Sequence, residues 1–102
     1  MDLQQIGDQL RPVFESGKAR KAIVFGSLAR GTAERRSDLD LLVVDDEPLP
    51  YLRRLDKYYD AIVTLLHVPL DLFVYTSREF EENLELPFLS RVIKEGQVIY
   101  EP

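Results

Sequence analysis

The feature that most constrains this sequence is a pair of aspartates, Asp38 and Asp40, at the start of the apolar run Leu41-Leu42-Val43-Val44. The run predicts a strand over residues 38–44. Side chains alternate along a strand, so we expect both carboxylates on one face and Leu39 on the other. Two carboxylates this close repel each other, and burying them unpaired is costly. A divalent cation with oxygen ligands is the ordinary solution, so the pair predicts a metal site.

A second feature, Gly26-Ser27, ends an earlier apolar run over residues 21–26. We expect this run to be a buried strand and residues 27–31 to form a short helix. Backbone N–H groups and the positive end of a helix dipole favour a phosphate at such a turn. Taken alone, a Gly-Ser pair is more simply a strand-to-helix turn. Together with the aspartates it predicts a site for a metal-bound nucleoside triphosphate.

The bulk properties exclude several classes of protein. The 102 residues are enough for one domain, residues 1–102, with a modest core. The net charge of −5 argues against direct nucleic-acid binding, because such domains usually carry a basic face. There is no cysteine, which excludes disulfides and thiolate metal sites. Without a membrane-length apolar run or a signal-peptide pattern, we expect a cytoplasmic protein and no membrane partner.

The spacing of apolar residues predicts one α/β (α+β) domain with a small mixed sheet of about four strands flanked by helices. Further strands are expected over 70–75 and 97–100, and further helices over 2–16, 50–67, 78–84 and 87–96. In the long helix, one apolar stripe is expected to face the core: Leu52, Leu55, Tyr59, Ile62, Val63 and Leu66. Three places are candidates for an apolar surface that meets a partner: Tyr51, Tyr58 and Leu86-Pro87-Phe88-Leu89.

Asp71 completes the acidic set, because it is the second residue of the strongly apolar strand over 70–75. If this strand pairs beside residues 38–44, Asp71 reaches the same end of the sheet as Asp38 and Asp40. Three carboxylates there would hold two divalent ions, which assist an in-line phosphoryl or nucleotidyl transfer. Asp71, set apart from the pair, is the natural general base for the incoming hydroxyl.

The remaining polar residues near these strands have simpler interpretations. Asp45 and Asp46 are expected to be solvated turn residues rather than ligands, given the prolines that follow them. Arg35 and Arg36 are most simply a solvated loop, although they are close enough in sequence to touch phosphate. His67 is expected at a helix C-terminus, where a cation suits the dipole, and not in a catalytic role.

The chain resembles the minimal nucleotidyltransferases, a branch of the DNA polymerase beta-like superfamily. Their signature is Gly-Ser, ten residues and Asp-x-Asp, here Gly26-Ser27 and Asp38-Leu39-Asp40. Phe25, Ala29-Arg30-Gly31 and the closing Glu95-Gly96 with Tyr100 also look like the family pattern. The resemblance extends from the first helix to the last strand.

The resemblance implies transfer of AMP from ATP, with two Mg²⁺ ions on Asp38, Asp40 and Asp71. It implies that Gly26 and Ser27 hold the triphosphate, with Arg30 as a weaker candidate for a phosphate contact. Relatives of this size are typically antitoxins paired with a HEPN-domain toxin, which they silence by binding and by adenylylating a tyrosine. Larger relatives carry an acceptor domain. We expect no room for one here, so the acceptor surface would come from a partner, in a homo- or hetero-oligomer.

Two other functions stay open at this stage. One is a binding module, an antitoxin that keeps the fold but neutralises its partner by contact alone. The other is nucleotidyl transfer to a small molecule such as an aminoglycoside. The complete aspartate set favours the enzyme over the binding module, and the missing acceptor domain counts against the small molecule.

Overall fold

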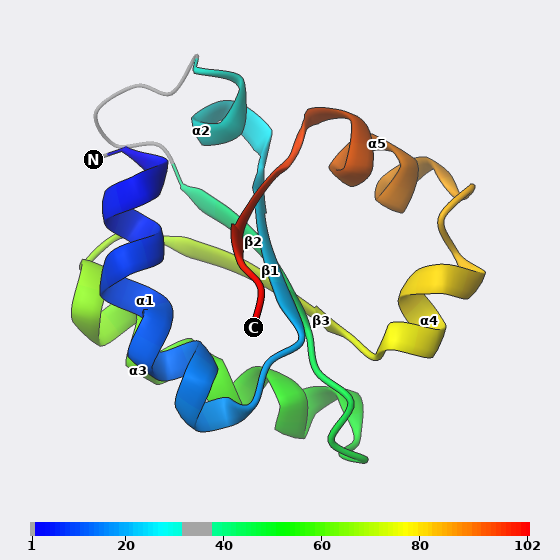
Figure 1. Cartoon of the computed structure of the whole chain (residues 1–102), viewed down its shortest axis with the longest axis horizontal. Coiled ribbons are helices and arrows are strands. Elements are labelled where there is room, and N and C mark those ends of the chain that lie inside the picture. Colours follow the sequence, from blue (N-terminus) through cyan, green and yellow to red (C-terminus); the bar gives the residue numbers. More distant parts are fainter. Residues whose placement is uncertain (1, 32–37) are drawn as a thin grey trace.

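The protein folds into one sheet with helices on both faces, seen in a computed structural model that describes residues 2–31 and 38–102 (Figure 1). The elements are α1 (Leu3–Gly17), β1 (Lys21–Phe25), α2 (Gly26–Arg30), β2 (Leu39–Val44), α3 (Tyr51–Leu66), β3 (Leu70–Tyr75), α4 (Ser77–Glu82), α5 (Pro87–Glu95) and β4 (Gln97–Tyr100). Their types and order match the sequence prediction, with boundaries that differ by one or two residues. The predicted α/β class with a mixed sheet is therefore confirmed. None of the described helices is long and apolar enough to cross a membrane.

The strand order is β3-β2-β1-β4. β2 and β3 are parallel, whereas β1 runs antiparallel to β2 and to β4. A parallel pair needs a long crossover, and α3 provides it between β2 and β3. The parallel register places Asp40 opposite Asp71, so strand pairing brings together two carboxylates that are 31 positions apart in the chain.

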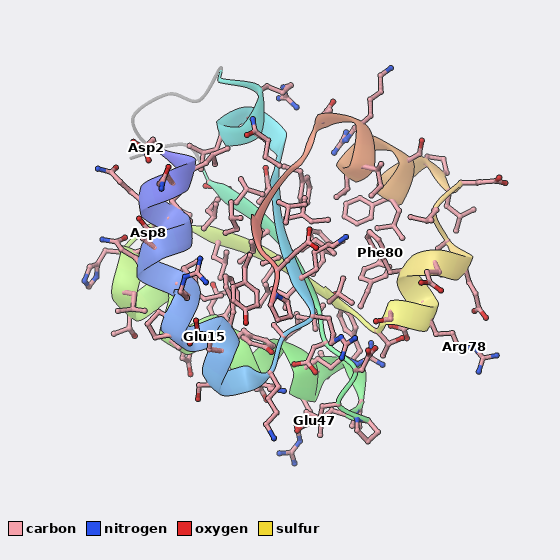
Figure 2. All side chains as sticks on the ribbon, in the orientation of Figure 1. Asp2, Asp8, Glu15, Glu47, Arg78 and Phe80 are labelled. Carbon is pink, nitrogen blue, oxygen red and sulfur yellow. The ribbon has the colours of Figure 1, made fainter. Side chains whose placement is uncertain are left out.

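The two faces of the sheet have separate cores (Figure 1). α1 and α3 pack against the first face, where Leu39, Leu41 and Val43 are fully buried. α5 covers the second face, and its Leu89 and Val92 are buried there with neighbouring strand residues. Figure 2 labels Phe80 of α4, which packs against this second core. Odd-numbered residues of β2 therefore point to α1 and α3, and even-numbered ones, including Asp40, to the α5 face.

Side-chain caps fix where two helices begin. Asp2 accepts a hydrogen bond from the backbone N–H of Gln5, and the Gln5 side chain accepts one from the Asp2 N–H. Thr76 and Glu79 form the same reciprocal capping box at the start of α4. Each box satisfies two otherwise unpaired groups at a helix N-terminus. His67 is the exposed C-cap of α3, in the left-handed region with φ 53°, which confirms its predicted place at a helix end.

The predicted core stripe of α3 is partly wrong. Leu52 is 73% exposed and Tyr59 42% exposed, whereas Tyr58, predicted as a surface residue, is 1% exposed. The buried face is Tyr58, Ile62 and Leu66, spaced by four residues, with Leu55 packed against it. Tyr58 fits there because its ring packs against that of Phe14, with centroids 6.3 Å apart, and its hydroxyl hydrogen-bonds Asp45. An amphipathic tyrosine can occupy a core position when its hydroxyl has a partner.

The prediction of a solvated Asp45 is also wrong, since this residue is 3% exposed. Its carboxylate accepts hydrogen bonds from the Tyr58 hydroxyl and the Glu47 N–H and lies 2.6 Å from the Lys57 ammonium. Burial alone would raise the pKa of Asp45, but the Lys57 and Tyr58 contacts outweigh it and lower that pKa. The neighbouring Asp46 is exposed, as predicted, and accepts hydrogen bonds from Ser77.

The predicted surface segment of residues 86–89 is only half correct. Leu86 is 55% exposed, but Leu89 is 1% exposed and lies in the second core. Phe88 is partly buried against the same core. Helical spacing explains the split, because Leu89 and Val92 share the face of α5 that meets the sheet. Tyr51 is 42% exposed, in agreement with its predicted surface position.

Candidate active site

The candidate site lies at the end of the sheet where β2 and β3 begin. Asp40 is the second residue of β2 and Asp71 the second of β3, and the two are directly opposite in the parallel register. Both occupy the α5 face of their strands, because Leu39, Leu41, Leu70 and Leu72 fill the opposite face. The predicted meeting of these two aspartates is confirmed. Asp38 immediately precedes β2 and is exposed.

The environment raises the pKa of Asp40 to about 6. Burial is the largest cause, followed by a hydrogen bond with Asp71 and by repulsion from the charges of Asp71 and Asp38. A hydrogen bond between two carboxyl groups requires a proton on one of them. Without a cation, the close approach of Asp40 and Asp71 is therefore less costly below about pH 6, where Asp40 keeps a proton.

Gly26 leaves the space that the Asp40 carboxylate occupies. It follows β1 directly, opens α2 and has φ +72°, a conformation that L side chains rarely adopt. A Cβ at this position would stand 2.0 Å from Oδ2 of Asp40. The predicted strand-to-helix turn at Gly26-Ser27 is confirmed, and the glycine is needed both for the backbone turn and for the close approach of the carboxylate.

Arg30 connects the short α2 helix to α5. Its guanidinium Nη1 lies 2.9 Å from Oε2 of Glu95. A second contact holds α2 in place, because the side-chain amide of Gln97 donates a hydrogen bond to the Ala29 carbonyl at 3.1 Å. Arg30 is exposed, so the ion pair with Glu95 is accessible to solvent. Its predicted contact with phosphate stays a prediction. The other basic residues predicted nearby, Arg35 and Arg36, lie outside the described residues.

The donor set suits a hard divalent cation. Asp38, Asp40 and Asp71 supply only carboxylate oxygens, the ligands that Mg²⁺ prefers in proteins. Within residues 2–31 and 38–102, however, no three acidic, histidine or cysteine side chains lie close enough together to hold one metal ion. Asp40 and Asp71 are in contact and Asp38 acts on Asp40 only through its charge. The chemistry of these donors therefore fits such a cation, with Asp40 and Asp71 already side by side and Asp38 near them.

One residue near the site was missed by the sequence interpretation. Arg91 of α5 is close enough to Asp40 for its positive charge to oppose the rise in that carboxyl's pKa. In the sequence it is only one of several charged residues on an amphipathic helix, and no motif marks it. Its position follows from the packing of α5 across the β2–β3 face, which depends on tertiary contacts.

A family model described as a nucleotidyltransferase domain matches residues 8–100. The chain belongs to the nucleotidyltransferase family. MJ0604 of Methanocaldococcus jannaschii, named as a proposed protein adenylyltransferase, is 32% identical to this nucleotidyltransferase over 87 residues, covering 82% of this chain and 81% of the relative. These matches confirm that the protein is an enzyme of nucleotidyl transfer.

Solved structures show the same fold. A proposed minimal nucleotidyltransferase superposes with a TM-score of 0.69 at 31% identity, covering 95% of both chains. A toxin–antitoxin complex with AMP-PNP matches with a TM-score of 0.69 at 19% identity, over 94% of this chain and 73% of that one. A complex of the tri-AMPylated Shewanella oneidensis HEPN toxin with its MNT antitoxin gives 0.64 at 16% identity, over 98% and 73%. The resemblance to minimal nucleotidyltransferases is confirmed. At their low identities the last two structures bear on the fold alone.

Proposed function

We propose that this nucleotidyltransferase transfers AMP from ATP to a hydroxyl group of a partner protein, and that it thereby acts as an antitoxin. The observation that supports this function best is the pairing of Asp40 with Asp71 beside the Gly26 turn. This arrangement brings two carboxylates, a backbone turn that approaches one of them closely and the exposed Asp38 to one end of the sheet. A structural role alone does not require such a costly cluster.

Asp38, Asp40 and Asp71 are the residues that would hold Mg²⁺. The metal would supply charge neutralisation of the triphosphate and activation of the attacking oxygen. Gly26 and Ser27 would orient the triphosphate through backbone N–H groups, with Arg30 as an additional phosphate contact. Exchange of the α–β phosphoanhydride bond for an ester bond to the acceptor oxygen then needs little more than positioning and charge.

Asp71 would take the proton of the acceptor hydroxyl. As the hydroxyl oxygen forms its bond to the α-phosphorus, the bond from that phosphorus to the pyrophosphate oxygen breaks, and pyrophosphate leaves. The exposure of Asp71 supports this role, since a base must be accessible to a bulky acceptor. Asp40 is more buried and lies against Gly26, which suits a fixed metal ligand.

The partner we propose is a HEPN-type toxin modified on a tyrosine. Two lines support it: a relative at 32% identity is named as a proposed protein adenylyltransferase, and similar folds occur in complexes of an MNT antitoxin with a HEPN toxin, one of them tri-AMPylated. Asp38 and Asp71 are exposed, so the hydroxyl group of a protein acceptor can approach them.

The experiment that tests this function uses α-labelled ATP, Mg²⁺ and host lysate. Wild type is compared with the double variant Asp38→Asn/Asp40→Asn, and labelled bands are identified and their modified residue mapped by mass spectrometry. A protein labelled on a hydroxyl residue only by the wild type supports the proposal. Label on a small molecule such as an aminoglycoside would overturn the choice of acceptor.

A second arm tests whether catalysis is needed for neutralisation. Wild type and the double variant are each co-expressed with the toxin candidate that the labelling identifies. Growth that is restored equally by both proteins would establish a binding antitoxin and overturn the catalytic part of the proposal.

A further inference from the structure

We propose that Arg91 of α5 binds the β- and γ-phosphate oxygens of the bound nucleotide. This inference rests on the proposed function, because it assigns a ligand contact within that same site. Neither the signature motifs nor the fold of the relatives points to this residue; the observations that do are all on α5 and the strands beneath it.

α5 is fixed across the strands that carry the aspartates. The ring of Phe88 lies with its centroid 5.6 Å from that of Phe25 and 4.8 Å from that of Phe73. Phe25 is the cross-strand neighbour of Asp40, and Phe73 is two residues beyond Asp71 on the same face. Phe88 also stacks on Tyr75, with centroids 6.4 Å apart, so these contacts fix the start of α5 over the middle of the sheet, next to strand residues that neighbour the aspartates.

Arg91 is three residues after Phe88, so the two side chains lie on neighbouring positions of one helix face. Val92 next to it is fully buried, whereas Arg91 is exposed. Glu95, four residues further along the same helix, reaches Arg30 of α2, and α2 opens at Gly26, so this face of α5 borders the site. The action of the Arg91 charge on Asp40 agrees with that position. Asp40 in turn lies against Gly26, at the turn proposed to hold the triphosphate.

Arg91 has no ion-pair partner among the described residues, whereas Arg30 would have to leave Glu95 to contact a phosphate. Arg30 is already paired with Glu95 at 2.9 Å. Glu95 would otherwise be the ordinary partner of Arg91, four residues earlier on the same helix. Arg91 forms no salt bridge with any residue of 2–31 or 38–102. The Arg30–Glu95 pair therefore leaves the Arg91 guanidinium without that partner.

The chemistry of the site explains what such a cation would do. In the absence of nucleotide, the charge of Arg91 opposes that of Asp40. A divalent metal held by the aspartates would neutralise them and would leave the triphosphate as the anion for Arg91 to contact. A guanidinium can donate two parallel hydrogen bonds to phosphate oxygens, which a lysine cannot match. Contact with the β- and γ-phosphates would also stabilise the departing pyrophosphate.

The test compares Arg91→Ala with Arg78→Ala, a control that makes the same chemical change on α4. Figure 2 shows Arg78 pointing away from the body of the protein, and its side chain is 85% exposed, so its loss leaves the site untouched. Calorimetry with Mg²⁺ measures the affinity of each variant for AMP-PNP and for AMP. Urea unfolding verifies that both variants are folded.

We expect Arg91→Ala to bind AMP-PNP about 10- to 100-fold more weakly than wild type, in the range of a lost charge-assisted hydrogen bond. AMP affinity should change less than about twofold, because AMP lacks the two outer phosphates. Arg91→Lys should restore part of the loss. A merely structural role would weaken both ligands equally, and that result would overturn the inference, as would wild-type affinity for AMP-PNP in Arg91→Ala.

Failure of this inference and failure of the proposed function give different results. If wild type binds AMP-PNP and labels its acceptor while Arg91→Ala binds AMP-PNP as well as wild type, only the Arg91 contact is refuted. If wild type binds no AMP-PNP with Mg²⁺, both are refuted.

Discussion

Replacing Gly26 by alanine separates the backbone requirement of the β1–α2 turn from the space that the Asp40 carboxylate needs. Gly26 has φ +72°, and a Cβ there would stand 2.0 Å from Oδ2 and 3.0 Å from Cγ of Asp40. Non-bonded atoms pack at about 3.5–4.0 Å, so the carboxylate must withdraw by more than about 1 Å. It would then leave both Asp71 and the position proposed for the metal.

Gly31 provides the matched control, because it has almost the same backbone conformation without the contact. Its φ is +75°, and no described heavy atom lies within 4 Å of a Cβ placed there. The left-handed backbone costs an L residue roughly 1–2 kcal/mol, so both alanine variants should lose about that much stability. Asp40 can relieve the clash by rotating, and for this reason we expect the stability of Gly26→Ala to fall at most about 1 kcal/mol below that of Gly31→Ala.

The two variants should differ in activity far more than in stability. Displacement of a reacting group or ligand by about 1 Å can cost about 100-fold in rate, so Gly26→Ala should lose at least that much AMP transfer. Gly31→Ala should stay within a few-fold of wild type. The assay pairs labelled-ATP transfer with urea unfolding. Equal activity in the two variants would refute the reasoning, since it would mean that the position of Asp40 beside Gly26 does not matter.

Three further substitutions test the charges described above. The pKa of Asp40 is about 6 instead of 3.8, so between about pH 4 and 6 the folded protein keeps a proton that the unfolded chain releases. The free energy of unfolding without metal should therefore fall as the pH rises through that window. Asp40→Asn should abolish this fall in urea unfolding with EDTA, and an unchanged pH dependence would contradict the assignment. Asp71→Asn should slow AMP transfer more than it weakens Mg²⁺–ATP binding, and equal losses would remove the role of base. Lys57→Met leaves the buried carboxylate of Asp45 without its ion-pair partner and should reduce the free energy of unfolding by about 2–3 kcal/mol. This loss is smaller than for a fully buried pair because Lys57 is partly exposed. The exposed control Arg11→Met should change stability by less than about 0.5 kcal/mol, and a similar loss in both would refute the buried-pair argument.

Element types could be read from the sequence because they depend on local patterns. Alternation in residues 70–75 placed Asp71 and Leu72 on opposite faces, and the structure agrees. The turn at Gly26-Ser27 was likewise visible, because its chemistry lies within a few adjacent residues. The signature of Gly26-Ser27 with Asp38 and Asp40 then identified the family.

The rotation of α3 about its own axis could not be read in this way. Leu52 and Tyr59 fit a helical stripe as well as Tyr58 does, and hydrophobicity favoured the wrong set. Tyr58 is buried because a hydrogen-bond partner, Asp45, comes from the end of β2. Asp45 is buried for the reciprocal reason, since Lys57 and Tyr58 compensate its charge. Each placement depends on the other, and no single segment of the chain contains both.

The sequence by itself determined the kind of chemistry, because residue type and local spacing fix which groups can bind a metal and a phosphate. Only the tertiary structure decided the working arrangement of these groups. The parallel register of β2 and β3 sets Asp40 against Asp71, Gly26 leaves space for the carboxylate, and the packing of α5 brings Arg91 close enough for its charge to act on Asp40. The physical reason is the short range of these interactions. Hydrogen bonds and charges act over a few ångströms in space, and the fold brings residues more than 60 positions apart in the chain within that distance, as it does for Arg30 and Glu95.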